Sequence, residues 1–165
     1  AASDVYKRQV LSSTLPDINM VSAPSIARDK GIAITETKKD EHSAYESYIR
    51  ITLISKIEKF SIGGTIFSDG NPRIVQINGI NLEAGLMPNM LYVTNKDVPG
   101  LIGSLGNILG DEKINIASFN LGRTGPLEDA IALIGIDKTA NDNVIKQVKR
   151  LESVVQVKSL NFNII

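Results

Sequence analysis

The chain has 165 residues, of which 18 are Lys or Arg and 18 are Asp or Glu, so its formal net charge is zero. A balanced charge gives no strong field that would attract nucleic acid or an anionic membrane surface. Cysteine is absent, which removes disulfides, thiolate nucleophiles and most zinc sites and fits a reducing cytoplasm. The sequence has no long apolar run and no signal segment, so we expect a soluble cytoplasmic protein without a membrane partner.

The first half of the chain predicts a helix followed by an antiparallel sheet. Residues 1–10 match no periodic pattern, and we expect a ragged or linker start over residues 1–17. The stretch 17–32 (DINMVSAPSIARDKGI) combines a cap residue, Pro24 and a stop glycine at Gly31, which is typical of one short helix. Alternating β-branched residues then predict strands within 34–38, 45–55, 59–69 and 73–79, with a turn at 69–73 (DGNPR).

The second half predicts a different architecture. GLMPN (85–89) interrupts the pattern and marks a boundary between a domain at 18–87 and a domain at 88–165. Beyond it the pattern predicts strands at 90–95, 114–123, 129–137 and 154–162, with helices that begin at Pro99 and within 140–153. The order βαββαβ is the ferredoxin-like plan, in which two helices cover one face of a four-stranded antiparallel sheet. The predicted fold class is α+β.

Three glycines spaced by three, Gly100, Gly103 and Gly106, suggest a nucleotide-binding loop at first sight. A dinucleotide fingerprint needs G-x-G-x-x-G in the turn between a strand and a helix. Here the spacing is G-x-x-G-x-x-G, it lies within the helix, and no Gly-Lys-Ser/Thr of a P-loop follows. We therefore interpret Gly103 and Gly106 as points where the helix packs closely on its sheet.

The turn before these glycines carries the more informative chemistry. The turn places an amide and a carboxylate beside a helix N-terminus through Asn95, Asp97, Pro99 and Gly100. The backbone N–H groups of Gly100 and Leu101 can donate hydrogen bonds to a small anion there. A carboxylate next to such an anion site suits a zwitterion, that is, an amino acid. The common alternative is that Asp97 only caps the helix.

A second polar residue is expected to join this turn. Asn115 lies just inside the second strand of the βαββαβ unit, and we expect it to lie beside the turn because the first and third strands are central and the second strand starts nearby. The alternative is that Asn115, between Ile114 and Ile116, faces water.

Basic residues and the single histidine give weaker signals. Lys56, Lys59 and Arg73 lie on neighbouring predicted strands and are candidates for an anion site, although basic residues on strand faces are usually solvated. His42 stands in a charged stretch and has no partner for metal ligation or for a catalytic triad. Because the sequence shows no nucleophile–base pair, carboxylate pair or metal cluster, we interpret the chain as a binding or regulatory module.

Two stretches resemble a known family. Residues 93–123 (VTNKDVPGLIGSLGNILGDEKINIASFNLGR), followed by DAIALIGID and LESVVQVKSLNF, resemble the ACT domain at the C-terminus of D-3-phosphoglycerate dehydrogenase. The preceding NMVSAPSIARDKGI and RIVQINGINLE resemble the allosteric substrate-binding domain of the long form of that enzyme. The resemblance covers about residues 18–163.

The resemblance implies a serine-sensing regulatory segment. In that family the complete enzyme oxidises 3-phosphoglycerate with NAD in L-serine biosynthesis, and ACT domains pair edge to edge with L-serine bound between them as feedback inhibitor. The family's ligand-contacting positions fall on Asn95, Asp97 and Asn115, where Asn95 replaces a His or Tyr. An anion-binding residue falls on Arg73 and a second family Arg falls on Gly85.

The resemblance also implies that this chain lacks the NAD-binding and catalytic domains, so no cofactor is expected in it. The partners that it implies are L-serine or a similar amino acid, a second copy of the chain and the catalytic domains of the parent enzyme. Regulatory domains of an iron–sulfur L-serine dehydratase, or another amino-acid-sensing ACT protein, are the alternative. RNA binding, which shares the βαββαβ topology, is disfavoured because the strand 129–137 carries no aromatic residue.

Overall fold

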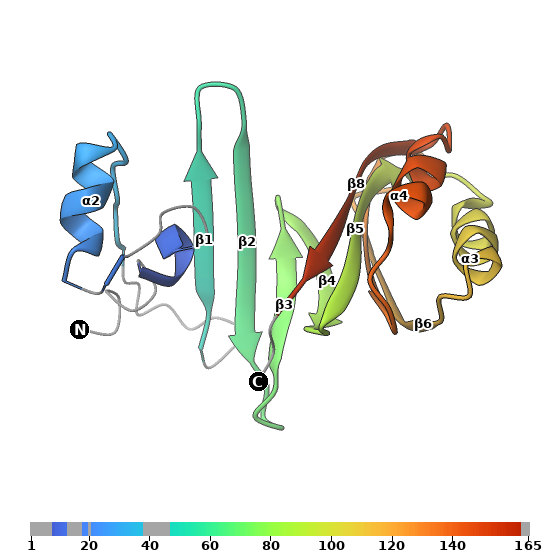
Figure 1. The fold of residues 1–165 in the computed structure, drawn as a ribbon, viewed down its shortest axis with the longest axis horizontal. Helices are drawn as coiled ribbons and strands as arrows, with labels where there is room; N and C mark the ends of the chain where they lie inside the picture. Colours follow the sequence, from blue (N-terminus) through green and yellow to red (C-terminus); the bar gives the residue numbers. More distant parts are fainter. Residues whose placement is uncertain (1–7, 13–17, 20, 38–46, 163–165) are drawn as a thin grey trace. The chain divides into compact units, whose positions relative to one another are not determined.

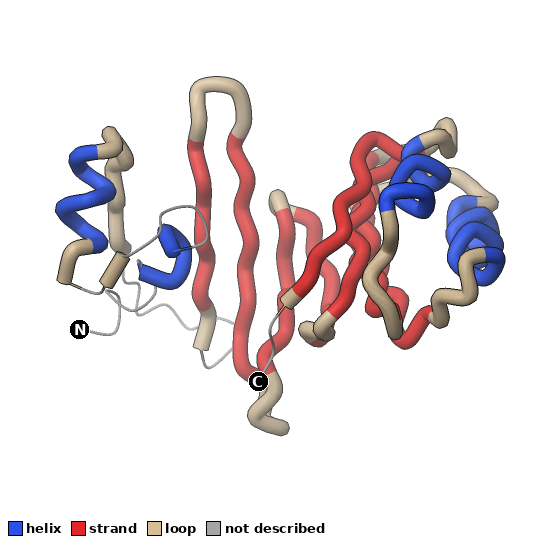
Figure 2. The backbone as a smooth tube through the Cα atoms, in the orientation of Figure 1, coloured by secondary structure: helices blue, strands red, loops and turns tan. Residues whose placement is uncertain are grey.

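The structure is a computed structural model that describes residues 8–12, 18–19, 21–37 and 47–162. It forms two compact units, residues 1–41 and residues 42–165, and each is considered by itself. Figure 1 traces the chain, and Figure 2 shows its helices and strands. His42 lies outside the described residues, so its interpretation stays a prediction.

The first unit contains helix α2 (Ala23–Asp29), with proline in its first turn as predicted. Gly31 ends it with φ 71°, a left-handed conformation that glycine adopts without steric cost. Two expectations are wrong. Residues 8–12, expected to be ragged, are helical, and residues 34–37, expected to be a strand, have no regular structure. A small apolar cluster forms in this unit from Leu11, Ile18, Ala23 and Ala27.

The second unit begins with an antiparallel meander of four strands in the order β1-β2-β3-β4. Their bounds are Ile49–Ile54, Lys59–Ile66, Pro72–Ile77 and Ile80–Gly85. The predicted turn at 69–73 connects β2 to β3, with Gly70 at φ 79° and the Asn71 amide donating to Asp69 Oδ1 at 2.9 Å. The strands predicted within 45–55, 59–69 and 73–79 are therefore confirmed as β1, β2 and β3.

Strand β4 was missed by the sequence patterns. It follows β3 through Asn78 (φ 49°) and Gly79 (φ 84°), the two positive-φ positions of a type I′ hairpin turn. The Asn-Gly pair is the strongest short-range hairpin signal in a sequence, and it would have predicted this strand. β4 buries Ile80, Leu82 and Ala84 on one face.

The remaining elements form the predicted βαββαβ unit. Its members are β5 (Asn89–Lys96), α3 (Leu101–Asp111), β6 (Ile116–Arg123), β7 (Asp129–Ile136), α4 (Asp142–Lys149) and β8 (Val154–Asn161). The sheet order is β6-β7-β5-β8, with all pairs antiparallel. The first and third strands of the unit, β5 and β7, are central, as predicted, and the α+β fold class is confirmed.

Both faces of this second sheet are covered within the second unit. On one face α3 and α4 (Figure 1) bury an aliphatic core that includes Leu91, Val93, Leu105 and Val144. On the other face β3 and β4 of the first sheet contribute Ile77, Ile80 and other apolar side chains against Met90, Tyr92, Ile131 and Leu133. Burial raises the pKa of the Tyr92 phenol, because the low-polarity surroundings disfavour the charged form.

The interpretation of the helix glycines as packing points is wrong. A Cβ built at Gly103 or Gly106 would meet no atom within 4 Å. The buried positions of α3 are Leu101, Leu105 and Leu109, and at about 100° per residue Gly103 falls on the opposite face of the helix and Gly106 on its flank. Neither glycine therefore lies in the face that packs on the sheet.

Within the described residues, no helix is long and apolar enough to span a bilayer.

A pair of substitutions on α3 tests this orientation. Leu105 is fully buried, whereas Ile102 is 56% exposed. We expect Leu105→Ala to lower the free energy of unfolding by about 3 kcal/mol, because the change removes buried methyl groups and leaves a cavity. Ile102→Ala should change it by less than about 0.5 kcal/mol. Urea unfolding followed by circular dichroism measures both, and equal effects would contradict the orientation of the helix.

Candidate functional site

The turn from β5 into α3 is the predicted effector site, and its helix begins without a side-chain cap. The N-cap residue is Gly100, with φ 96°, and no side chain accepts a hydrogen bond from the first turn. The interpretation of Asp97 as a helix cap is therefore wrong. The first backbone N–H groups of α3, which have no intrahelical acceptor, begin a helix whose positive dipole end favours an anion.

Asp97 forms an ion pair instead of a cap. Its Oδ2 lies 3.0 Å from Nη1 of Arg123, and the two side chains are 19% and 59% exposed. The backbone of Asp97 is fixed by the loop after β6: its N–H donates to the Glu128 carbonyl at 2.9 Å, and its carbonyl accepts from the Leu127 N–H at 3.1 Å. The turn therefore has a defined position at the end of the sheet.

Arg123 was not among the residues predicted from the sequence. It ends β6 and pairs with Ala130 of β7, which pairs in turn with Asn95 of β5. This register brings a guanidinium from another strand to the turn. The only signal available in the sequence was the βαββαβ order itself, in which the end of the second strand and the end of the first strand lie at the same end of the sheet.

Asn95 occupies a buried position below the turn. Asn95 is only 2% exposed. Its Nδ2 donates to the Lys96 carbonyl at 2.8 Å, while its Oδ1 is buried without a hydrogen-bond partner. A buried acceptor without a partner lowers the stability of the folded state. A donor group of a ligand that reaches this oxygen removes that cost.

Pro99 and Leu101 have different roles in the turn. Pro99 is exposed, whereas the Leu101 side chain is 7% exposed and packs into the helix-side core. Leu101 therefore offers only its backbone N–H group to a ligand.

Asn115 does not lie beside this turn within one chain, so that expectation is wrong. The adjacent Ile116 pairs with Ile136, whereas Arg123 pairs with Ala130, six residues away along β7. At about 3.4 Å per residue this separates Asn115 from the turn by about 20 Å. The parallel direction of β5 and β6 explains the error, because the start of one strand then lies at the opposite end from the finish of the other.

The three basic residues predicted as a weak anion site do not meet. Lys56 lies in the turn between β1 and β2. Lys59 pairs with Ile54 at the start of β2, whereas Arg73 pairs with Thr65, six residues further along, or about 20 Å. The prediction failed because it assigned residues to neighbouring strands without the register between them.

Arg73 is already engaged by its own surroundings. Its Nη2 bonds to Asp69 Oδ2 at 2.8 Å, its Nε lies 3.9 Å from Glu83 Oε1, and its guanidinium lies 5.2 Å from the centre of the Phe67 ring. The Asn71 backbone N–H, followed by the Asn71 and Arg73 side chains, lowers the pKa of Asp69 to about 2.

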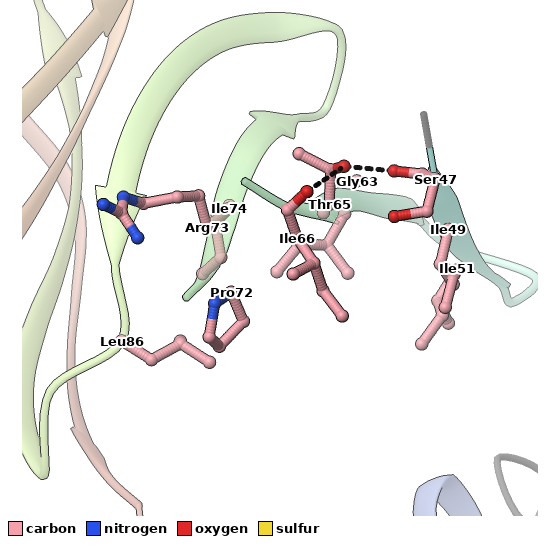
Figure 3. Close-up of a pocket in the computed structure, with 12 residues that line it drawn as sticks. Ser47, Ile49, Ile51, Gly63, Thr65, Ile66, Pro72, Arg73, Ile74 and Leu86 are labelled. Atoms are coloured by element: carbon pink, nitrogen blue, oxygen red, sulfur yellow. Dashed lines mark hydrogen bonds between the residues drawn. The ribbon is translucent and has the colours of Figure 1, made fainter. Parts of the chain in front are cut away.

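A shallow groove of about 260 Å³ lies on the first sheet beside Arg73 (Figure 3). Figure 3 shows the Arg73 guanidinium directed away from the apolar side chains, and a hydrogen bond from the Thr65 hydroxyl to the Ser47 carbonyl. The groove is aliphatic and is lined chiefly by Ile49, Ile51, Ile62, Ile66, Ile74 and Leu86. Its chemistry does not suit a small anion.

The sheet face that RNA-recognition motifs use is not accessible here. Such motifs stack bases on aromatic residues of their central strands. In this protein the corresponding face of β5 and β7, opposite the helices, is buried under β3 and β4 through Met90, Tyr92, Ile131 and Leu133. Among the residues that the structure describes, no group of three or more His, Cys, Asp or Glu side chains is placed to hold a metal ion.

Comparison with known proteins identifies both halves of the chain. Residues 6–78 match the D-3-phosphoglycerate dehydrogenase intervening domain, and residues 89–153 match the ACT domain. The D-3-phosphoglycerate dehydrogenase of Bacillus subtilis is 30% identical over 144 residues, which cover 87% of this chain and 27% of that protein.

Other relatives carry the same name. The D-3-phosphoglycerate dehydrogenase of Methanocaldococcus jannaschii is 33% identical over 166 residues, covering 96% of this chain and 31% of the relative. D-3-phosphoglycerate dehydrogenase 2, chloroplastic, of Arabidopsis thaliana is 26% identical over 149 residues, covering 83% and 24%. The chain thus spans between 24% and 31% of the length of these relatives, and it matches their C-terminal part.

The environment of Asp69 gives a pH prediction. Because its pKa is lowered from 3.8 to about 2, its contribution to stability is present above pH of about 4 and is lost as the pH falls through about 2. Carboxyl-carbon NMR shifts of Asp69 followed against pH should give a midpoint near 2.

Arg73→Ala should raise the midpoint of Asp69 but keep it below 3.8, because the Asn71 backbone bond, the largest cause of the shift, remains. A wild-type midpoint near 3.8 would show that the turn does not hold the carboxylate.

Proposed function

Because the chain belongs to the D-3-phosphoglycerate dehydrogenase family through its intervening domain and its ACT domain, we propose that it is the amino-acid-sensing regulatory segment of such an enzyme. The effector is L-serine, bound at the turn between β5 and α3. The parent enzyme oxidises 3-phosphoglycerate with NAD, and both bind to its catalytic domains.

The observation that carries the proposal is the charge arrangement at the turn. An uncapped helix start and the Arg123 guanidinium, 3.0 Å from Asp97, suit a carboxylate, while Asp97 suits an ammonium group. Since the Asp97–Arg123 pair is partly exposed, a zwitterion can insert between its two charges and preserve the pairing of both. The unpaired Oδ1 of Asn95 is, in this proposal, the acceptor for the serine hydroxyl or ammonium.

A second copy of the chain completes this site in the proposal. β6 is an edge strand of its sheet, and two such edges that pair antiparallel about a two-fold axis place the start of one β6 beside the end of the other. Asn115 of one copy then approaches Arg123 and Asp97 of the other. The separation of Asn115 from the turn within one chain therefore supports a site shared between two copies.

The outward face of α3 supports the same arrangement. Gly103, Gly106 and Gly110 leave open space at their Cα positions, and Ile102 beside them is 56% exposed. A row of glycines allows a neighbouring helix to approach closely and to cover the exposed isoleucine, as is expected when two βαββαβ units join edge to edge with their helices on one side.

The alternative parent is an iron–sulfur L-serine dehydratase, or another enzyme with an amino-acid-sensing ACT domain. The relatives named above are all D-3-phosphoglycerate dehydrogenases, and the intervening-domain match extends over residues 6–78. Both findings favour the dehydrogenase as the parent.

Isothermal titration calorimetry of the chain with L-serine tests the proposal. We expect saturable binding, and we expect Asp97→Ala to weaken it by about 10- to 100-fold, since a hydrogen bond to a charged group contributes about 1.5–3 kcal/mol. Asn115→Ala should weaken binding and also lower the dimer fraction in analytical ultracentrifugation with serine present.

The matched control is Asp111→Ala, which removes an exposed carboxylate at the other end of α3 and should leave binding unchanged. Absence of heat at millimolar L-serine would refute serine as the effector. Binding of another amino acid with the same dependence on Asp97 would retain the site and change its ligand.

A further inference from the structure

The two sheets of the second unit share one apolar core. The side chains that meet in it come from β3 and β4 on one side and from β5 and β7 on the other: Ile77, Ile80, Leu82, Ala84, Met90, Tyr92, Ile131 and Leu133. The Phe60 ring of β2 adds an edge-to-face contact with Tyr92, with 6.3 Å between ring centres and 81° between planes. Strand β3 lies in the intervening-domain match, β5 and β7 lie in the ACT match, and β4 lies in residues 79–88 between the two matches. The shared core therefore joins the two matched regions.

Backbone-level contact occurs where β4 crosses β6. A Cβ built at Gly122 would lie 2.5 Å from the Asn81 carbonyl oxygen and 2.9 Å from Cγ2 of Ile80. A Cβ at Gly135 of β7 would meet the sulfur of Met87, which lies in the segment between β4 and β5. At Gly122 the nearest atom belongs to the backbone of β4 and cannot move aside, so β6 has glycine where the other sheet presses on it.

A hydrogen-bond chain connects this contact to the far edge of the first sheet. Arg50 of β1 donates from Nη2 to Gln76 Oε1 at 2.7 Å, and Gln76 of β3 donates from Nε2 to Asn81 Oδ1 at 2.9 Å. Asn81 is the residue whose carbonyl lies against Gly122. Side-chain bonds therefore lead from β1 across the sheet to the point where β4 contacts the ACT edge strand.

We propose that the two sheets unfold and refold together as one cooperative unit, and that β4 is the element that couples them. If β4 left its place, the ACT sheet would expose Met90, Tyr92, Ile131 and Leu133 to water, which the hydrophobic effect opposes. Any event that stabilises or displaces β6 consequently changes the stability of the first sheet as well. The coupling does not depend on which ligand the ACT domain binds.

Native-state hydrogen exchange on the full chain tests the coupling. Leu82 of β4 is 8% exposed and lies in the shared core. Leu82→Ala should lower the protection factors of β5 and β7 amides by the same factor as those of β3 and β4 amides, about a hundredfold, because a buried Leu→Ala change has an effect of this order. Loss of protection confined to β1–β4, with β5 and β7 unchanged, would overturn the proposal.

A milder variant keeps the test valid if Leu82→Ala fails to fold. Ile80→Val removes one methyl group from the same core and should lower protection in both sheets by about fivefold. The matched control is Leu53→Ala on β1, where the side chain is 56% exposed; it should leave β5 and β7 protection within about twofold. Unequal changes in the two sheets with Ile80→Val would also overturn the proposal.

Discussion

The central strands β5 and β7 have no face exposed to water, and the remaining architecture of residues 47–162 depends on this double burial. One face is covered by α3 and α4, and the other by β3 and β4. From Ala130 to Ile136 every residue of β7 is buried, a pattern expected of a strand enclosed on both sides. Residues 130–136 are therefore buried along their whole length. The central strands are not accessible to other molecules, which can reach this sheet through its edges and its loops.

This constraint determines where a ligand can bind. The ACT sheet has two edges, β6 and β8, and the turn before α3 lies at the end of the sheet, held by backbone bonds to the loop between β6 and β7. Asp97 and Arg123 meet there because the register aligns the ends of β5 and β6. An effector bound at this position would contact the strand that β4 covers, so the proposed ligand site and the proposed coupling between the sheets share β6.

Local patterns predicted the elements well where a single period dominated. The strands predicted after residue 44, the helices of the βαββαβ unit and the turn at 69–73 all follow from side-chain spacing and turn chemistry. The same patterns misassigned residues whose role depends on a neighbour distant in sequence. Gly103 and Gly106 were assigned to a packed face that they do not occupy, while Gly122, which does contact the other sheet closely, carried no recognisable signal.

The sequence by itself determined the βαββαβ order, the α+β class and the position of the candidate turn, because these depend on periodicity and on residues close together in the chain. Only the tertiary structure decided that Asp97 pairs with Arg123, that Asn115 lies at the opposite end of the sheet, and that Lys59 and Arg73 are far apart. Strand direction and register convert positions in the chain into distances, and neither is encoded in the spacing of residues along one segment.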